Sequence, residues 1–145
     1  MRHLLLTILA IAGVWVAAAQ PAIIPTPQRY TALSGVFTLT SSDNISVVNG
    51  ELLHLADYLA KKLNIGVATD GNITLRLDAS LKAEEYRLSV DADKVEIRGG
   101  GYGGVFNGVA TLFQLLPTDV YSTLKLPAHI ACCSVEDAPR YDYRG

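Results

Sequence analysis

The sequence predicts one α+β domain, in which a mostly antiparallel sheet of about five to seven strands carries two helices packed on one face. Residues 86–90 and 94–98 alternate apolar with polar side chains around a short turn, the pattern of an antiparallel hairpin with one buried face. Residues 51–63 and 105–116 instead carry apolar side chains at helical spacing. Because the strands alternate, both helices are expected on the buried face of the sheet.

Length and composition limit the classes of function. The 145 residues suffice for one domain after processing, and a hydrophobic content of 50% is too high for a disordered chain. The formal net charge is -2, and no basic cluster is present. Both facts argue against a nucleic-acid-binding protein and against attraction to an anionic membrane surface.

The N-terminus has the pattern of a secretory signal peptide. A short polar start precedes an apolar run over residues 4–16, and three alanines over residues 17–19 follow it. Residues 1–19 are therefore predicted to be removed, leaving an exported chain, periplasmic or extracellular, that begins at Gln20. The alternative is an uncleaved membrane anchor. It is disfavoured because the run is shorter than the roughly 20 apolar residues that span a bilayer, and because Pro21, Pro25 and Pro27 follow.

The first part of the mature chain is expected to be extended. Prolines make residues 23–27 an extended opening segment, because proline fixes φ and biases the preceding residue away from helix. Residues 36–40 and 45–48 are short β-type runs, and the polar residues 41–44 between them favour a hairpin. Residues 73–77 alternate as a further strand.

Two segments form the helices. Asn49 is expected to cap the helix over residues 51–63, and Gly66 to end it. The apolar stripe of this helix consists of Leu52, Leu55, Ala56, Leu59 and Leu63. The helix over residues 105–116 is apolar on several sides, so it is expected to be buried on most of them. A last apolar strand is predicted over residues 126–135.

The run Gly99–Gly104 formally matches the G-x-G-x-x-G pattern of dinucleotide-binding sites, and it lies between a strand and a helix. The preceding strand, however, alternates with charged residues and pairs backwards in a hairpin. The first strand of a dinucleotide-binding fold is normally buried on both sides. The glycines are therefore expected to form a tight turn that brings the helix close to the sheet.

Candidate catalytic carboxylates are few. Glycosidases generally place two carboxyl groups across the scissile bond, and the adjacent acidic pairs are Glu84–Glu85 and Glu136–Asp137. Neighbouring residues of a strand point to opposite faces. A solvated or structural role is therefore expected for both pairs.

Thiol catalysis also finds little support. His54 is expected on the polar side of a helix, and one strand turns His129 and Cys132 to opposite faces. Cys132 and Cys133 are adjacent, which disfavours a disulfide between them, and no His or Cys lies near them at the spacing of a metal site. Both are expected to be buried strand residues, with an intermolecular disulfide as the alternative.

The last residues are the most suggestive of binding. Arg144 offers the bidentate hydrogen bonds that suit vicinal hydroxyls or carboxylates, and Tyr141 and Tyr143 offer aromatic faces on which a sugar stacks. The alternative is a frayed terminus with a solvated arginine.

Four stretches carry a family resemblance in their order: Ile23–Pro27, Glu85–Val90 with Val95–Ile97, Gly104–Leu116, and Asp137–Gly145. Together they resemble the family 20 glycoside hydrolases, the β-N-acetylhexosaminidases, over nearly all of the mature chain. The third stretch resembles the helix motif G-x-F-Y-G-x-Q-T-L-x-Q-L of the hexosaminidase N-terminal domain, with Asn107 and Ala110 replacing the usual Tyr and Gln. The resemblance implies an N-terminal domain over residues 20–136. It also implies that residues 137–145 lead into a (β/α)8 catalytic barrel that residues 1–145 lack.

The resemblance implies hydrolysis of terminal β-linked N-acetylhexosamine by substrate assistance with retention. The 2-acetamido oxygen attacks the anomeric carbon, a Glu is the general acid/base, and the preceding Asp orients the acetamido group. Both belong to a barrel motif that resembles His-x-Gly-Gly-Asp-Glu and does not occur here, so no catalytic residue is assigned to this chain. Arg144 matches the family's substrate-binding Arg at the start of the barrel. Neither a metal nor an organic cofactor is implied.

The resemblance further implies that the small domain packs on the barrel and that the chain by itself is inactive. A related alternative is another hydrolase with a similar leading domain, such as the family 84 N-acetylglucosaminidases. The step Pro139–Tyr141 favours family 20. The alternative from a different class is a freestanding secreted module that binds carbohydrate or protein without catalysis.

Overall fold

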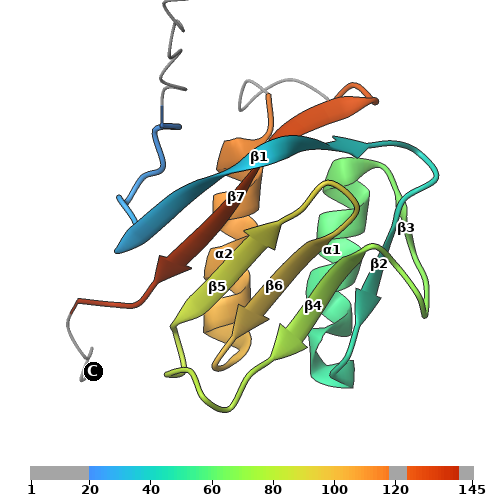
Figure 1. Ribbon diagram of the computed structural model, residues 1–145. Helices are drawn as coiled ribbons and strands as arrows, with labels where there is room; N and C mark the ends of the chain where they lie inside the picture. Colours follow the sequence, from blue (N-terminus) through green and yellow to red (C-terminus); the bar gives the residue numbers. More distant parts are fainter. Residues whose placement is uncertain (1–19, 118–123, 141–145) are drawn as a thin grey trace, which may run out of the picture.

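Two helices cover one face of a seven-stranded sheet in the part of the chain that the computed structural model describes, residues 20–117 and 124–140 (Figure 1). The strands are β1 (Arg29–Leu39), β2 (Asn44–Val47), β3 (Gly66–Val67), β4 (Ile73–Leu77), β5 (Tyr86–Val90), β6 (Val95–Gly99) and β7 (Ala128–Asp137). The helices are α1 (Leu53–Leu63), which follows the 3-10 turn η1 (Gly50–Leu52), and α2 (Tyr102–Leu115).

The strand order is β1-β7-β5-β6-β4-β2-β3. The first four strands pair antiparallel, and they hold most of the paired residues. The strands from β6 to β3 pair parallel. The expected hairpin of β5 and β6 is present, with Tyr86 opposite Gly99 and Val90 opposite Val95. The predicted fold class is therefore confirmed.

The hairpin predicted over residues 36–40 and 45–48 is wrong. β1 pairs with β7 at one edge of the sheet, whereas β2 lies between β3 and β4 near the other edge. A turn does form between them, because the Asp43 carboxylate accepts a hydrogen bond from the Thr40 N–H at 2.6 Å. Alternation and turn residues predict strands and turns, but the partner of β1 is the last strand in the sequence, which no local pattern identifies.

The helix predicted over residues 51–63 is present as η1 and α1, and Asn49 occupies the N-cap position of η1, but the side-chain cap and the end at Gly66 are wrong. The helix ends at Asn64, which adopts the left-handed conformation at φ 55, and Gly66 belongs to β3. Asparagine is the other residue that tolerates this conformation, because its short polar side chain forms local hydrogen bonds. The side chain of Asn49 does not cap the helix and instead accepts a hydrogen bond from the Leu77 N–H at 2.9 Å.

The core lies between the sheet and the two helices. Its fully buried side chains include Phe37, Leu39, Ile45, Leu75, Leu88 and Ile97 from the sheet, Leu55, Leu59 and Leu63 from α1, and Leu112 from α2. The opposite face of the sheet carries ion pairs, among them Arg29 with Glu136 at 3.3 Å. In the described ranges, neither helix is long and apolar enough to cross a membrane.

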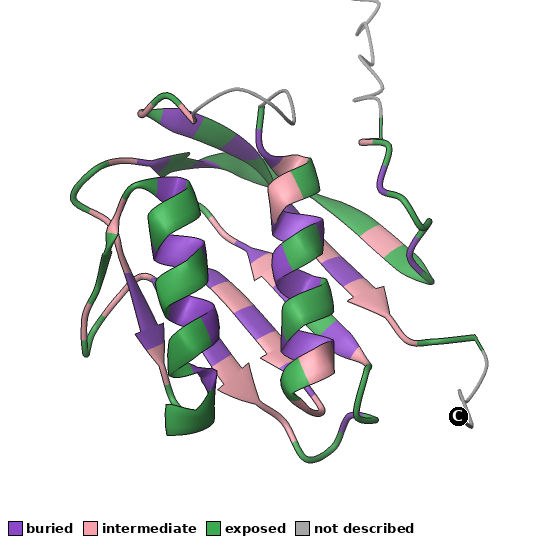
Figure 2. Ribbon diagram, turned by 180° about the vertical axis from the view of Figure 1, so that it is seen from behind, coloured by how far each residue is buried: buried purple, intermediate pink, exposed green. Residues whose placement is uncertain are grey.

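Helix α2 is less buried than its sequence predicts. Val105, Val109 and Leu112 face the sheet and are buried, but Tyr102 and Phe106 are 49% and 47% exposed. Figure 2 shows both helices from the solvent side, with buried residues toward the sheet and exposed residues along the outside. The expectation of burial on most sides is therefore wrong for the described chain, because the side of α2 turned away from the sheet carries exposed residues.

Candidate functional site

The described chain begins and ends along the same side of α2, and hydrogen bonds hold the two ends there. The Gln114 side chain accepts a hydrogen bond from the Ile24 N–H at 2.7 Å and donates one to the Ile24 carbonyl at 3.0 Å. The Gln28 N–H donates to the Asp137 carboxylate at 3.1 Å, and the Gln28 side-chain amide donates to the Ala138 carbonyl at 3.0 Å. The segment that leaves the domain is thus fixed to the segment that enters it.

A cavity of about 230 Å³ lies at this junction. Its polar lining residues are Glu84, Tyr86, Asn107, Thr111, Gln114 and Asp137. The Tyr86 hydroxyl hydrogen-bonds the Thr111 hydroxyl at 2.6 Å inside the fold. Burial raises the pKa of Tyr86 and the Asp137 charge adds to the increase, although the Thr111 hydrogen bond opposes it. The phenol therefore stays neutral and serves in this cavity as a hydrogen-bonding group.

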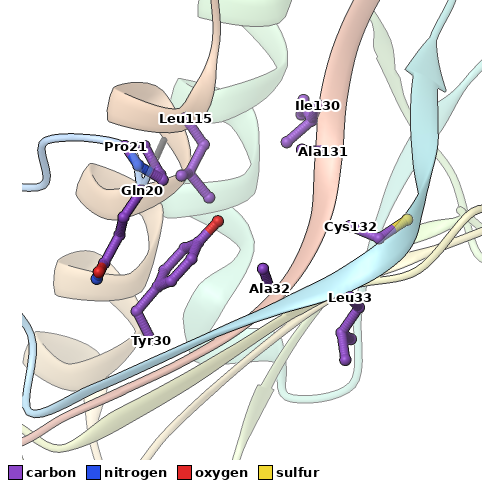
Figure 3. Close-up of a pocket in the computed structure, with 9 residues that line it drawn as sticks. All are labelled: Gln20, Pro21, Tyr30, Ala32, Leu33, Leu115, Ile130, Ala131 and Cys132. Atoms are coloured by element: carbon purple, nitrogen blue, oxygen red, sulfur yellow. The ribbon is translucent and has the colours of Figure 1, made fainter. Parts of the chain in front are cut away.

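A second cavity, of about 430 Å³, lies between the N-terminal residues, strand β1 and strand β7 (Figure 3). Tyr30, Ala32 and Leu33 line it from β1, and Ile130, Ala131 and Cys132 line it from β7. None of its nine lining residues is a carboxylate or a histidine. The cavity therefore offers no acid/base pair for glycoside hydrolysis.

The backbone of neighbouring residues occupies the space beside the glycine run Gly99–Gly104. A Cβ atom at Gly100 would overlap the Lys82 carbonyl, and one at Gly104 would overlap the Glu85 carbonyl. The segment before β5 thus occupies the space in which a pyrophosphate would lie. The predicted tight turn with close helix–sheet approach is confirmed, and the dinucleotide pattern is a formal match only.

Neither acidic pair forms a catalytic pair. Glu136 lies on the outer face of the sheet, where it pairs with Arg29 at 3.3 Å and with Arg87 at 3.8 Å, whereas Asp137 binds the Gln28 N–H. Glu85 accepts a hydrogen bond from the Lys82 N–H at 3.0 Å in the turn before β5. The structural role expected for these residues is confirmed.

The histidines and cysteines among the described residues do not form a catalytic group. His54 is exposed on α1, and His129 is exposed on β7, where its Nδ1 lies 3.1 Å from the Thr38 hydroxyl. Cys132 and Cys133 are free and buried. Burial raises the pKa of the Cys133 thiol to about 11, against a smaller opposing effect of its hydrogen bond with Tyr30. The thiol is therefore protonated at neutral pH and is a poor nucleophile.

Arg144, Tyr141 and Tyr143 lie outside the described residues, so the substrate-binding role of Arg144 stays a prediction. Across residues 20–117 and 124–140, no group of three or more His, Cys, Asp and Glu side chains gathers as a metal site would require.

The junction residues Gln28 and Gln114 were not identified from the sequence. Each is a single amide side chain, and its partner lies about a hundred positions away in the chain. A local pattern carries no signal for such a contact. The only hint is the glutamine of the helix motif, which is Gln114 here.

Comparison with known proteins identifies the family. Residues 20–138 match the family model described as glycosyl hydrolase family 20, domain 2. The chain is 35% identical over 138 residues to a β-hexosaminidase of Porphyromonas gingivalis. This alignment covers 85% of this chain and 18% of the relative. The chain is 33% identical over 139 residues to a β-hexosaminidase of Vibrio furnissii, covering 88% of this chain and 21% of the relative.

Solved structures agree with this match. The Streptomyces plicatus N-acetyl-β-hexosaminidase is 32% identical with a TM-score of 0.76, over 84% of this chain and 27% of that chain. The family 20 enzyme of Streptomyces coelicolor is 30% identical with a TM-score of 0.75, over the same shares. The chain thus spans about a fifth of the curated relatives named above, whose matched shares are 18% and 21%. With the family model matching most of its length, the chain belongs to glycosyl hydrolase family 20, of which it carries domain 2.

Proposed function

We propose that this chain is the N-terminal part of a secreted β-N-acetylhexosaminidase, whose catalytic barrel belongs to the same polypeptide. The supporting observation is the match of residues 20–138 to domain 2 of a glycosyl hydrolase family, in a chain that spans only about a fifth of its relatives. Among the described acidic residues, Glu136 pairs with Arg29 and Asp137 binds the Gln28 N–H, which fits a supporting role. The substrates are glycans with terminal non-reducing N-acetylhexosamine.

The chain contributes support and one substrate contact. The hydrogen bonds of Gln28 hold Asp137 and Ala138 in place, only a few residues before Arg144, and those of Gln114 hold the entering segment at Ile24. A guanidinium donates two parallel hydrogen bonds, which suits neighbouring hydroxyls of one sugar. Arg144 is the residue proposed to bind the terminal sugar, and the carboxylates that perform hydrolysis come from the barrel.

Turnover of an aryl N-acetyl-β-hexosaminide tests this assignment. This chain by itself is expected to be inactive, and the longer polypeptide that carries it to be active. Arg144→Lys in the longer polypeptide is expected to raise KM, because lysine keeps the charge but loses the bidentate geometry. Turnover by the purified chain above an empty-vector control would contradict the proposal.

Export is tested separately by sequencing the N-terminus of the chain recovered outside the cytoplasm. A mature N-terminus at Gln20 supports removal of residues 1–19 as a signal peptide. Recovery of the chain in membranes with Met1 retained would show the alternative, an uncleaved anchor.

A further inference from the structure

Removal of residues 1–19, proposed above, leaves Gln20 as the first residue of the chain. A glutamine in this position carries two groups that react with each other. Its α-amine has an ordinary pKa of about 7.7–8.0, so part of it is uncharged and nucleophilic at neutral pH. The carbons between this amine and the side-chain amide have the length that closes a five-membered ring. Gln20 therefore holds the nucleophile and the leaving group in one residue.

Gln20 is also accessible. It is exposed, and it lines the cavity of about 430 Å³ between the N-terminal residues, β1 and β7 (Figure 3). The hydrogen bonds that hold the entering segment come after it in the chain. The Ile23 N–H donates to the Pro21 carbonyl at 3.0 Å, and Gln114 binds both backbone groups of Ile24. Ring closure at Gln20 leaves these contacts intact, and an enzyme can reach this residue.

The surroundings of Gln20 favour a neutral group over an ammonium. Pro21, Leu115 and Ile130 are among the lining residues of the cavity, and none of the nine is a carboxylate. Tyr30 supplies no negative charge either, because burial raises the pKa of its phenol. An ammonium in such a cavity loses contact with water without gaining an opposite charge. A lactam is uncharged and still offers an N–H donor and carbonyl acceptors.

The other two glutamines of the sequence use their side chains differently. The Gln28 amide donates to the Ala138 carbonyl, and the Gln114 amide donates to the Ile24 carbonyl, both at 3.0 Å. The α-nitrogen of each is part of a peptide bond and is not a nucleophile. Cleavage before residue 20 therefore gives Gln20 a chemistry that neither Gln28 nor Gln114 has.

We propose that Gln20 is converted into an N-terminal pyroglutamate once residues 1–19 have been removed. The α-nitrogen attacks the side-chain amide carbon Cδ, and a new N–C bond forms. The bond between Cδ and Nε2 breaks, and Nε2 leaves as ammonia with one proton from the α-amine. The reaction consumes no oxidant, reductant or further reactant, and its product is a neutral lactam. This inference rests on the export proposed above.

Ring closure protects the entering segment from exopeptidases. Gln20 is followed by Pro21, and peptidases that remove an Xaa-Pro dipeptide need the free ammonium of the first residue. A lactam has no such ammonium. The blocked end therefore preserves the residues that lead to Ile24, where Gln114 holds the segment on α2.

Tandem mass spectrometry of the chain recovered outside the cytoplasm tests the proposal. Trypsin cleaves after Arg29, so the N-terminal peptide spans residues 20–29. This peptide is expected to be lighter than the encoded one by one ammonia, with fragment ions that assign the loss to Gln20 and leave Gln28 unchanged. An isotope-labelled synthetic peptide of residues 20–29, added before digestion, measures how much ring forms during handling. Conversion no greater than in this standard would overturn the proposal.

A matched variant shows whether the blocked end is a ring. Gln20→Asn keeps a side-chain amide but would have to close a strained four-membered ring, so its α-amine is expected to stay free. An amine-labelling reagent is expected to mark the N-terminal peptide of Gln20→Asn and to leave that of the natural sequence unmarked. A marked natural peptide would overturn the proposal. So would an unmarked Gln20→Asn peptide, because the block would then not be a lactam.

The same spectra separate this inference from the proposed export. A chain that begins at Gln20 with a free α-amine would contradict the pyroglutamate and uphold export. A chain recovered with Met1 retained would contradict export itself, and the pyroglutamate with it.

Discussion

The side-chain amide of Gln114 binds both backbone polar groups of Ile24, at 2.7 Å and 3.0 Å, and so joins two residues that lie 90 positions apart. The amide acts as a strand partner would, because it presents one donor and one acceptor side by side. Residues 20–28 precede the first strand of the sheet. Gln114 therefore fixes a segment that the sheet does not hold.

Replacing Gln114 with alanine is expected to release this segment. Loss of two solvent-accessible hydrogen bonds costs about 1 kcal/mol of unfolding free energy, measured by urea denaturation. Amide exchange around Ile24 is expected to accelerate. Asn107→Ala on the same helix is the control, because its single hydrogen bond, to the Glu84 carbonyl, is long at 3.4 Å. Equal effects of the two variants would show that Gln114 has no special role.

Two neighbouring glycines are expected to respond to alanine in opposite directions. At Gly104 a Cβ would overlap the Glu85 carbonyl, so Gly104→Ala is expected to destabilise the fold by roughly 1–3 kcal/mol through overpacking. At Gly103 a Cβ would meet only the Glu84 side chain, at 3.6 Å. Gly103→Ala is therefore expected to stabilise the helix by about 0.5–1 kcal/mol. Thermal denaturation of both variants tests the close approach of α2, and a stable Gly104→Ala protein would disprove it.

The buried pair Tyr86–Thr111 is expected to behave as a unit. Tyr86→Phe removes one hydroxyl of a 2.6 Å hydrogen bond and leaves the Thr111 hydroxyl buried, at a cost of about 1–3 kcal/mol. Adding Thr111→Val removes the second polar group, so the double variant is expected to recover part of that loss. Unfolding free energies of the single and double variants complete a thermodynamic cycle. Strictly additive effects would contradict the coupling.

Stability is expected to fall at alkaline pH through Cys133. Burial raises the pKa of this thiol from 9.0 to about 11, so the folded chain binds the proton more tightly than the unfolded chain. The resulting stabilisation is complete below pH 9 and is lost as the pH rises through about 11. The raised pKa values of Tyr30 and Tyr86 act in the same direction.

The dependence of Tm on pH between neutral and alkaline solution measures this effect. Cys133→Ala is expected to make the alkaline decrease shallower. Cys132→Ala, which removes only the smallest contribution to the raised pKa of Cys133, is expected to change the decrease less. Cys133 is also expected to react slowly with thiol reagents at neutral pH. An unchanged slope in Cys133→Ala would show that another group causes the decrease.

Much of the fold follows from local patterns. Alternation identified the β5–β6 hairpin, and helical spacing identified both helices. Strand partners and helix caps were harder to predict from the sequence. β1 pairs with β7, which lies almost a whole chain length away, and Asn64 rather than Gly66 ends helix α1. The structural role of the two acidic pairs was predictable from their strand positions, but their individual partners were not.

The sequence by itself determined the fold class, the family and the glycine turn before α2, because each depends on residue type and spacing along the chain. Only the tertiary structure decided which strands are neighbours, how Gln114 holds the entering segment on α2, and how Gln28 joins that segment to the leaving one. These properties arise from contacts between residues that are distant in the chain. The hydrophobic effect is non-directional, so an apolar pattern predicts that a surface is buried but not which element buries it.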